Sequence, residues 1–159
     1  MLAIKFREIL NKGFNLDETF EFMEKIREKV ILVAYMENLR MLAKSGRISR
    51  TSEFIANLGQ MKPMVVIDDG ELVPLAKVIS LKNAKKRIIA EVVRRAEKSV
   101  SYTLFSTHAN DEKTANELKN QVKEKLNISK SFVNFMGPVV GSRVGLNAQI
   151  ISAIPEIDP

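Results

Sequence analysis

The sequence contains no cysteine and only one histidine, His108. Without cysteine the chain can form neither a disulfide framework nor a thiolate metal site, and it has no thiol nucleophile. One histidine cannot supply a zinc site built from several histidines. These absences exclude most thiol and zinc chemistry, we expect no cofactor, and the lack of disulfides is typical of a cytoplasmic protein.

Long apolar runs are also missing: none reaches the roughly 18 residues that a membrane-spanning helix needs. The first eight residues already contain Lys5, Arg7 and Glu8, so we expect neither a signal peptide nor a transit peptide. The apolar fraction of 45% beside 28% charged residues is that of a folded domain. A chain of 159 residues has the size of one domain and can bury roughly two thirds of its unfolded surface.

Basic residues exceed acidic residues by 25 to 19, and the excess is local. The segment from Lys77 to Lys98 holds eight basic residues against Glu91 and Glu97, which alone gives +6. A second basic cluster consists of Arg40, Lys44, Arg47 and Arg50. Such clusters attract anionic partners, but a solvated helix face has the same composition, and the sequence leaves both interpretations open.

Apolar residues recur with helical or strand spacing along most of the chain. We expect helices at residues 2–10, from Asn15 to about residue 29, and at 37–44, 51–58, 81–98 and 110–126. We expect strands at residues 30–34, 64–67, 71–79, 102–106, 132–136 and 148–153. This order predicts an α/β or α+β fold, with a mixed sheet of about six strands, one β-hairpin and flanking helices.

Local signals fix several of these elements. Asn15 followed by Glu18 predicts a capping box, after which one helix face carries Phe20, Met23, Ile26 and Val30. Ser80 is expected to cap the long basic helix. Asp69-Gly70 predicts a tight hairpin turn, and Pro74 in the returning strand indicates an edge position or a bulge.

Three segments offer groups that could hold an anion. His108 is expected at the carboxyl end of a strand, where binding crevices of α/β sheets often lie, although a histidine there more often bonds to loop backbone. Residues 137–145 form a glycine-bearing loop with Ser142 and Arg143, which suits a carboxylate or a phosphate as well as a tight connection between strands. The segment 45–49, with Arg47, is open to the same two interpretations. Asp68 and Asp69 belong to the hairpin turn and form no acid–base pair.

Taken in order, these motifs resemble the carboxyl-terminal half of the DegV family of bacterial fatty-acid-binding proteins. The resemblance runs through Met36-Glu37-Asn38-Leu39-Arg40-Met41-Leu42-Ala43-Lys44-Ser45-Gly46-Arg47-Ile48-Ser49 and Asn57-Leu58-Gly59-Gln60-Met61-Lys62-Pro63-Met64. It continues in the hairpin Asp69-Gly70-Glu71-Leu72-Val73-Pro74, in Lys77-Val78, in His108-Ala109 and in residues 137–145. The resemblance extends from about residue 30 to residue 153, and it implies that residues 1–29 are a helical remnant of the amino-terminal domain and residues 30–159 the carboxyl-terminal domain.

The resemblance further implies a carrier that encloses one fatty acid between two domains and presents its carboxylate to a separate fatty acid kinase, without catalysis of its own. Arg47 and Arg143 are the candidates for the head group, with Ser142 and His108 behind them. Phe54, Met61, Phe135 and Met136 are the candidates for the acyl wall. Arg143 stands where the family has a histidine that contacts the head group, and Ile79 stands where it commonly has an arginine.

Two further expectations follow. Because the sheet of the family's amino-terminal domain has no counterpart in the sequence, an uncovered apolar surface would favour self-association. The alternative function is that of a basic protein-interaction module or nucleic-acid-binding module that has lost lipid binding. Nucleic acid is the less expected partner, because the sequence has few aromatic residues and most of them occupy apolar positions.

Overall fold

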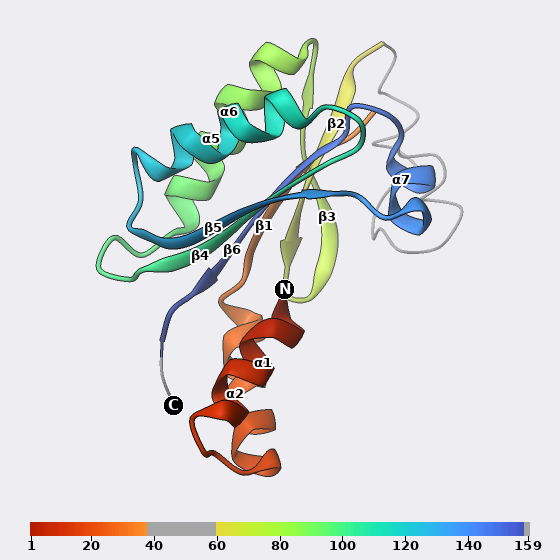
Figure 1. The fold of residues 1–159 in the computed structure, drawn as a ribbon. Coiled ribbons are helices and arrows are strands. Elements are labelled where there is room, and N and C mark those ends of the chain that lie inside the picture. Colours follow the sequence, from red (N-terminus) through yellow and green to blue (C-terminus); the bar gives the residue numbers. More distant parts are fainter. Residues whose placement is uncertain (38–59, 158–159) are drawn as a thin grey trace.

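The computed structural model describes residues 1–37 and 60–157, and these residues form a six-stranded mixed sheet in the order β3-β2-β1-β6-β4-β5 (Figure 1). The β4–β5 pair is parallel, and the other neighbouring pairs of the described sheet are antiparallel. The strands are β1 (Ile31–Tyr35), β2 (Lys62–Asp68), β3 (Glu71–Val78), β4 (Tyr102–His108), β5 (Ile128–Phe135) and β6 (Gln149–Pro155). The predicted fold class and all six strands are confirmed.

Helices lie on both sides of this sheet (Figure 1). We call the face that packs against α5 and α6 the helical face, and the opposite face, which packs against α1, α2 and α7, the second face. The helices are α1 (Leu2–Asn11), α2 (Leu16–Glu28), α5 (Leu81–Arg95), α6 (Glu112–Lys123) and α7 (Pro138–Val144). The helices expected at 37–44 and 51–58 lie outside the described residues, apart from Glu37.

The predicted capping box of α2 is present. The Asn15 side chain accepts a hydrogen bond from the backbone N–H of Glu18 at 2.9 Å, and the Glu18 carboxylate accepts one from the N–H of Asn15 at 3.0 Å. The inner face of α2 differs from the prediction in one residue: Phe20 is 60% exposed, whereas Phe22 is buried beside Met23. The helix start is a local signal, whereas the choice between two phenylalanines depends on where the sheet lies.

The long basic helix ends three residues earlier than expected, at Arg95. Its first turn is capped as predicted, because the Ser80 hydroxyl oxygen accepts from the N–H of Asn83 at 3.3 Å. At the other end Ala96 is extended, and the N–H of Glu97 donates to the Tyr102 hydroxyl oxygen at 2.9 Å. This contact with the start of β4 replaces a further helical turn.

The Asp69-Gly70 turn joins β2 and β3 as predicted, with positive φ angles of 48° and 77°. The β2–β3 register shifts between Met64 and Val65, opposite Pro74. Pro74 lacks a backbone N–H, and β3 is an edge strand, where that loss is tolerated. Both interpretations of Pro74, edge position and bulge, are therefore confirmed.

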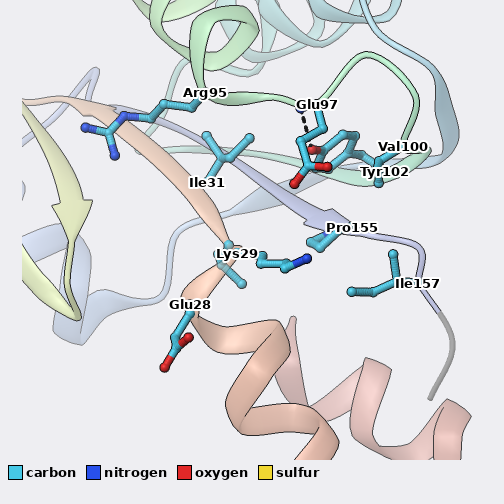
Figure 2. Close-up of a pocket in the computed structure, with 10 residues that line it drawn as sticks. Glu28, Lys29, Ile31, Arg95, Glu97, Val100, Tyr102, Pro155 and Ile157 are labelled. Atoms are coloured by element: carbon cyan, nitrogen blue, oxygen red, sulfur yellow. Dashed lines mark hydrogen bonds between the residues drawn. The ribbon is translucent and has the colours of Figure 1, made fainter.

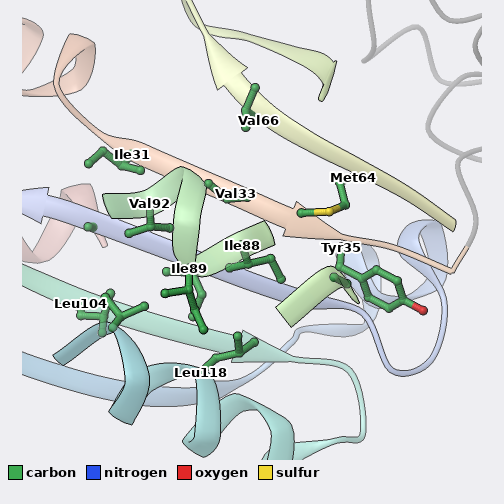
Figure 3. Close-up of a cluster of buried hydrophobic side chains, with 14 of the residues drawn as sticks. Ile31, Val33, Tyr35, Met64, Val66, Ile88, Ile89, Val92, Leu104 and Leu118 are labelled. Atoms are coloured by element: carbon green, nitrogen blue, oxygen red, sulfur yellow. The ribbon is translucent and has the colours of Figure 1, made fainter. Parts of the chain in front are cut away.

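The main core fills the space between the helical face and α5 and α6 (Figure 3). Val33 of β1 and Ile151 of β6 are fully buried in the middle of the sheet, and Ile88 of α5 and Leu118 of α6 pack over them. The predicted inner stripe of α5 is present: Ala84, Ile88, Ile89 and Val92 are buried, while Val93 and Ala96 pack at its margin.

The first two helices, α1 and α2, pack against the second face of the sheet. Ile9 of α1 and Ile26 of α2 are fully buried against Phe105 of β4 and Ile154 of β6. That these helices are a remnant of another domain stays a prediction.

Two ion pairs tie α1 to the sheet across more than a hundred residues of sequence. The Lys5 ammonium lies 2.7 Å from Glu156, after the end of β6, and Lys130 of β5 lies 2.8 Å from Glu8. Burial raises the pKa of the Glu156 carboxyl, but hydrogen bonds from Lys5 and Thr103 outweigh that effect and leave the pKa below its ordinary value.

Glu91 links α5 to the β2–β3 hairpin. Its carboxylate accepts hydrogen bonds from Arg94 at 2.6 and 2.9 Å and from Arg95 at 2.7 Å, and Arg95 also donates to the carbonyl of Ile67 at 3.2 Å. The bonds from Arg94 and then Arg95 lower the pKa of Glu91 to about 2, against the effect of its burial.

Replacement of Ile88 by alanine is expected to lower the free energy of unfolding by about 2–5 kcal/mol, because it leaves a cavity in the main core. Urea denaturation followed by circular dichroism measures the change. The matched control is Ile79→Ala, at a side chain that is 78% exposed, which should change stability by less than about 0.5 kcal/mol. Equal losses for the two variants would contradict this description of the core.

Glu91→Gln is expected to lower the free energy of unfolding by about 1–2 kcal/mol at pH 7, since the charged hydrogen bonds to both arginines are lost. A carboxyl whose folded pKa is depressed stabilises fully above its unfolded pKa of 4.5, and this contribution disappears as the pH falls towards about 2. Denaturation curves of both proteins should therefore differ at pH 7 and converge at about pH 2. Glu124→Gln, at an exposed residue just after α6, is the control and should show no such trend.

Candidate functional site

One end of the sheet gathers most of the predicted head-group residues, and we call it the α7 end. Strands β1, β4 and β5 finish there at Tyr35, His108 and Phe135, and β6 begins there at Gln149. The N–H of Met136 donates to the carbonyl of His108 at 2.8 Å, which fixes the chain as it turns into α7. The N–H of Glu37 donates to the carbonyl of Val144 at 3.2 Å, so the far end of α7 is anchored to the end of β1.

The predicted glycine loop at 137–145 is wrong in one respect, because residues 138–144 form the helix α7. Pro138 suits the first helical position, where its missing N–H costs nothing, and Gly145 ends the helix with a φ of 86°. Gly137 therefore caps the start of a helix, Gly141 lies within it, and Gly145 caps its end, so the segment is not an extended loop. Val144 is fully buried at its inner side.

Arg143 and Ser142 lie on α7. The Arg143 side chain is half-buried and forms no hydrogen bond or ion pair with any residue in 1–37 or 60–157. The Ser142 hydroxyl is exposed and donates to the carbonyl of Val139 at 3.2 Å, within the same helix. Among the described residues, α7 thus provides a cation without an ion-pair partner, beside a hydroxyl that can reorient.

His108 is at the same end but on the other face of the sheet. It is the last residue of β4, and alternation along the strand places it with Tyr102, Leu104 and Ser106 on the helical face. Its ring is nearly perpendicular to that of Phe135, with ring centroids 5.6 Å apart, so Phe135 lies on the helical face as well. His108 is 6% exposed, and its Nδ1 has no hydrogen-bond partner among the described residues. The structure therefore separates His108 from Arg143 by the thickness of the sheet.

The predicted acyl-wall residues have different environments. Met136 is 3% exposed and packs with Val65 and Val144, so it belongs to the core beneath α7. Phe135 is 70% exposed, and Met61, just before β2, is 39% exposed. Arg47 and Phe54 lie outside the described residues.

A charged cluster at the α7 end was not predicted. The Tyr35 hydroxyl donates to one oxygen of Glu37 at 2.7 Å, and the Lys62 ammonium lies 2.7 Å from the other oxygen. Burial raises the pKa of Glu37, but the bonds from Lys62 and Tyr35 together leave it below its ordinary value, while burial and Glu37 raise the pKa of Tyr35. The pairing of β1 with β2 brings Lys62 and Glu37 together, and no sequence motif could have predicted this cluster.

Between α7 and the α1–α2 pair, the second face carries a band of apolar and hydroxyl side chains. Leu32 of β1 and Ile150 of β6 are half-buried there, and Ser152 and Thr107 lie beside them on the same face by strand alternation. A band of this kind, with Arg143 at one end, suits an extended apolar molecule that carries one negative charge.

Two hollows lie at the opposite end of the sheet, near the hairpin. One of about 290 Å³ is lined by Glu28 and Lys29 at the end of α2, by Arg95 and Glu97 at the end of α5, and by Tyr102 (Figure 2). A neighbouring hollow of about 600 Å³ lies between α2 and the residues of the hairpin turn. Charges of both signs line these hollows, and Arg95 is already bound by Glu91 and Ile67, so they do not suit an acyl chain.

Two further properties limit the chemistry of the described residues. Within 1–37 and 60–157, no group of three or more histidine, aspartate or glutamate side chains could hold a metal ion. In the same part of the chain, no helix combines the length and apolar character needed to cross a membrane.

Comparison with solved structures places this fold among the DegV proteins. A DegV family protein from Thermus thermophilus, reported for its fatty acid binding, superposes with a TM-score of 0.88. The two are 22% identical, and the match covers 98% of this chain and 56% of that one. DegV from Bacillus subtilis, described as a fatty acid binding protein, gives a TM-score of 0.81 at 24% identity, with coverages of 98% and 55%. These likenesses confirm the fold that the sequence motifs predicted.

Sequence comparison with curated proteins also finds relatives of the DegV family. A DegV domain-containing protein of Streptococcus pyogenes is 30% identical over 155 residues, which cover 96% of this chain and 53% of the relative. A fatty acid-binding protein of Thermotoga maritima is 27% identical over 141 residues, with coverages of 87% and 49%. The chain thus spans about half the length of the curated relatives it matches. The family model described as an uncharacterised protein of the DegV family matches residues 1–156, and the chain therefore belongs to the DegV family.

Proposed function

We propose that this chain binds a long-chain fatty acid in the cytoplasm, as the carboxyl-terminal part of a DegV-like carrier. Relatives and structural neighbours named for fatty acid binding support the ligand class. The observation that carries the proposal is Arg143, a half-buried cation without a described partner at one end of the apolar second face. A fatty acid has the matching chemistry, since one carboxylate ends a long hydrocarbon chain.

In this arrangement the guanidinium of Arg143 holds the carboxylate through charge-assisted hydrogen bonds, and Ser142 donates a further one. Arg47 is the second head-group cation of the proposal. Phe54 and Met61 contact the acyl chain in this proposal, and Phe135 adds an exposed ring from the helical face of the edge strand β5. Met136 and His108 support the site without contacting the acid. Met136 packs beneath α7, and His108 is the buried last residue of β4.

The proposed function is binding without catalysis. The relatives are described as binding proteins, which supports this. The Glu37 carboxylate at the α7 end is bound on both oxygens by Tyr35 and Lys62, and so is not placed to act as a general base.

A separate kinase is the proposed recipient of the bound acid. A hollow of about 410 Å³ between β3 and α5 is lined by Ile79, Lys86 and Arg87, among others, and lies beside the α7 end because Val78 pairs with Lys62. Its basic lining, on the helix that carries most of the positive charge, suits an acidic surface of a partner. Because Ile79 stands where the family commonly has an arginine, the hollow has less positive charge than such an arginine would give it, but it remains open.

Arg143→Ala is expected to weaken fatty acid binding about 10- to 100-fold, the value of a hydrogen-bonded charge pair of about 1.5–3 kcal/mol. Displacement of a fluorescent fatty acid measures the affinity. Arg7→Ala, which removes an exposed arginine of α1 and the same net charge, is the control and should bind as tightly as the unaltered chain. Unchanged affinity in Arg143→Ala would refute its role, and an unaltered chain that binds no fatty acid would refute the proposed function.

Arg87→Glu is expected to weaken association with an acyl-phosphate-forming kinase while leaving fatty acid affinity unchanged, since Arg87 lies in the β3–α5 hollow and not on the second face. Acyl phosphate formation at increasing concentrations of the carrier measures the association. Lys125→Glu, which makes the same change of charge at an exposed residue just after α6, should leave it unaltered. Equal acyl phosphate formation by the Arg87 variant would argue against docking at this hollow.

A further inference from the structure

A small apolar hollow lies on the second face beneath α1. Ile4 and Met1 form one side, and the stacked rings of Phe105 and Phe132, with centroids 5.2 Å apart, form the other. Ile154 of β6 lines it as well. Ile4 is 53% exposed, Phe132 43% and Met1 36%, so large apolar side chains meet water at one place. Hydrocarbon that entered this hollow would therefore remove apolar surface of the protein from water.

The polar groups around the hollow are already paired with one another. Lys5 and Glu156 lie 2.7 Å apart, Thr103 donates to the second oxygen of Glu156, and Lys130 lies 2.8 Å from Glu8. Neither lysine is left to attract an anion, and two carboxylates stand beside the hollow. A head group therefore has no partner here, and the matching occupant is hydrocarbon.

The size of the hollow decides how much hydrocarbon it accepts. Its volume is about 30 Å³. One water molecule needs about 10–15 Å³ measured in this way, so the hollow takes roughly two groups of that size. It cannot hold a whole lipid, but it can hold the last one or two carbon atoms of a chain whose remainder lies elsewhere.

The position of the hollow connects it with the α7 end. Phe132 lies on the second face three residues before the end of β5, a separation along the strand of about 10 Å at roughly 3.3 Å per residue. Phe105, Thr107 and Arg143 follow the same direction on the second face, from the hollow towards α7. We propose that the hollow receives the methyl end of the acyl chain, so that α1 sets the preferred chain length; this inference rests on the proposed function.

The test compares saturated fatty acids of increasing length with the unaltered chain and Ile4→Trp. The larger side chain fills the hollow from a half-exposed helix position, so the fold should be kept. Each methylene that loses its burial lowers affinity roughly fourfold, so the loss for octadecanoic acid should be about 4- to 15-fold. Hexanoic acid, whose six-carbon chain is shorter than the separation of about 10 Å between the hollow and the end of β5, should bind Ile4→Trp and the unaltered chain equally.

Leu16→Trp is the matched control, because Leu16 is 64% exposed at the start of α2 and does not line the hollow. Phe132→Ala provides the opposite change, since it enlarges the hollow and should shift the preference towards longer acids. Equal affinities of the unaltered chain and Ile4→Trp at every length would overturn the inference and leave the proposed function standing. Failure of the unaltered chain to bind any acid would overturn both.

Discussion

The structure depends on the need to cover the two central strands, β1 and β6, on both faces. Val33 and Ala34 are successive residues of β1 that point to opposite faces, and both are fully buried. The same holds on β6, where Ile151 and Ala153 face α5 and α6 while Ile154 faces α1 and α2. Two layers of helices are therefore required, and the band of the second face between α7 and α1 is where the proposed ligand would complete the cover.

The elements that the sequence predicted well are those with local causes. The capping box of Asn15 and Glu18 and the turn at Asp69-Gly70 are set by residues within three positions of one another. The early end of α5 could not be predicted in this way, because it depends on the hydroxyl of Tyr102 on another element. Helix α7 was missed because glycines at its two ends indicate a loop, whereas its helical conformation is supported by Pro138 and by the burial of Val144.

The order of motifs in the sequence predicted which residues belong to the candidate site, but not how those residues are arranged in space. The resemblance correctly indicated the family and brought Ser142 and Arg143 into consideration. It grouped His108 with them, yet the face of His108 follows from the length of β4, which was expected to end at Ser106 and extends to His108. The Tyr35–Glu37–Lys62 cluster and the Lys5–Glu156 pair join distant segments, and only tertiary structure shows them.

The pairing of β1 with β6 sets Ile31 beside Ala153. The middle of the sheet is thus closed by residues more than a hundred positions apart, and closing so long a loop makes folding slow. The β2–β3 hairpin and the β4–α6–β5 unit can form earlier, since each is local. During synthesis these two pieces precede β6, so β1 keeps one unpaired edge until β6 has been made and can pair with it.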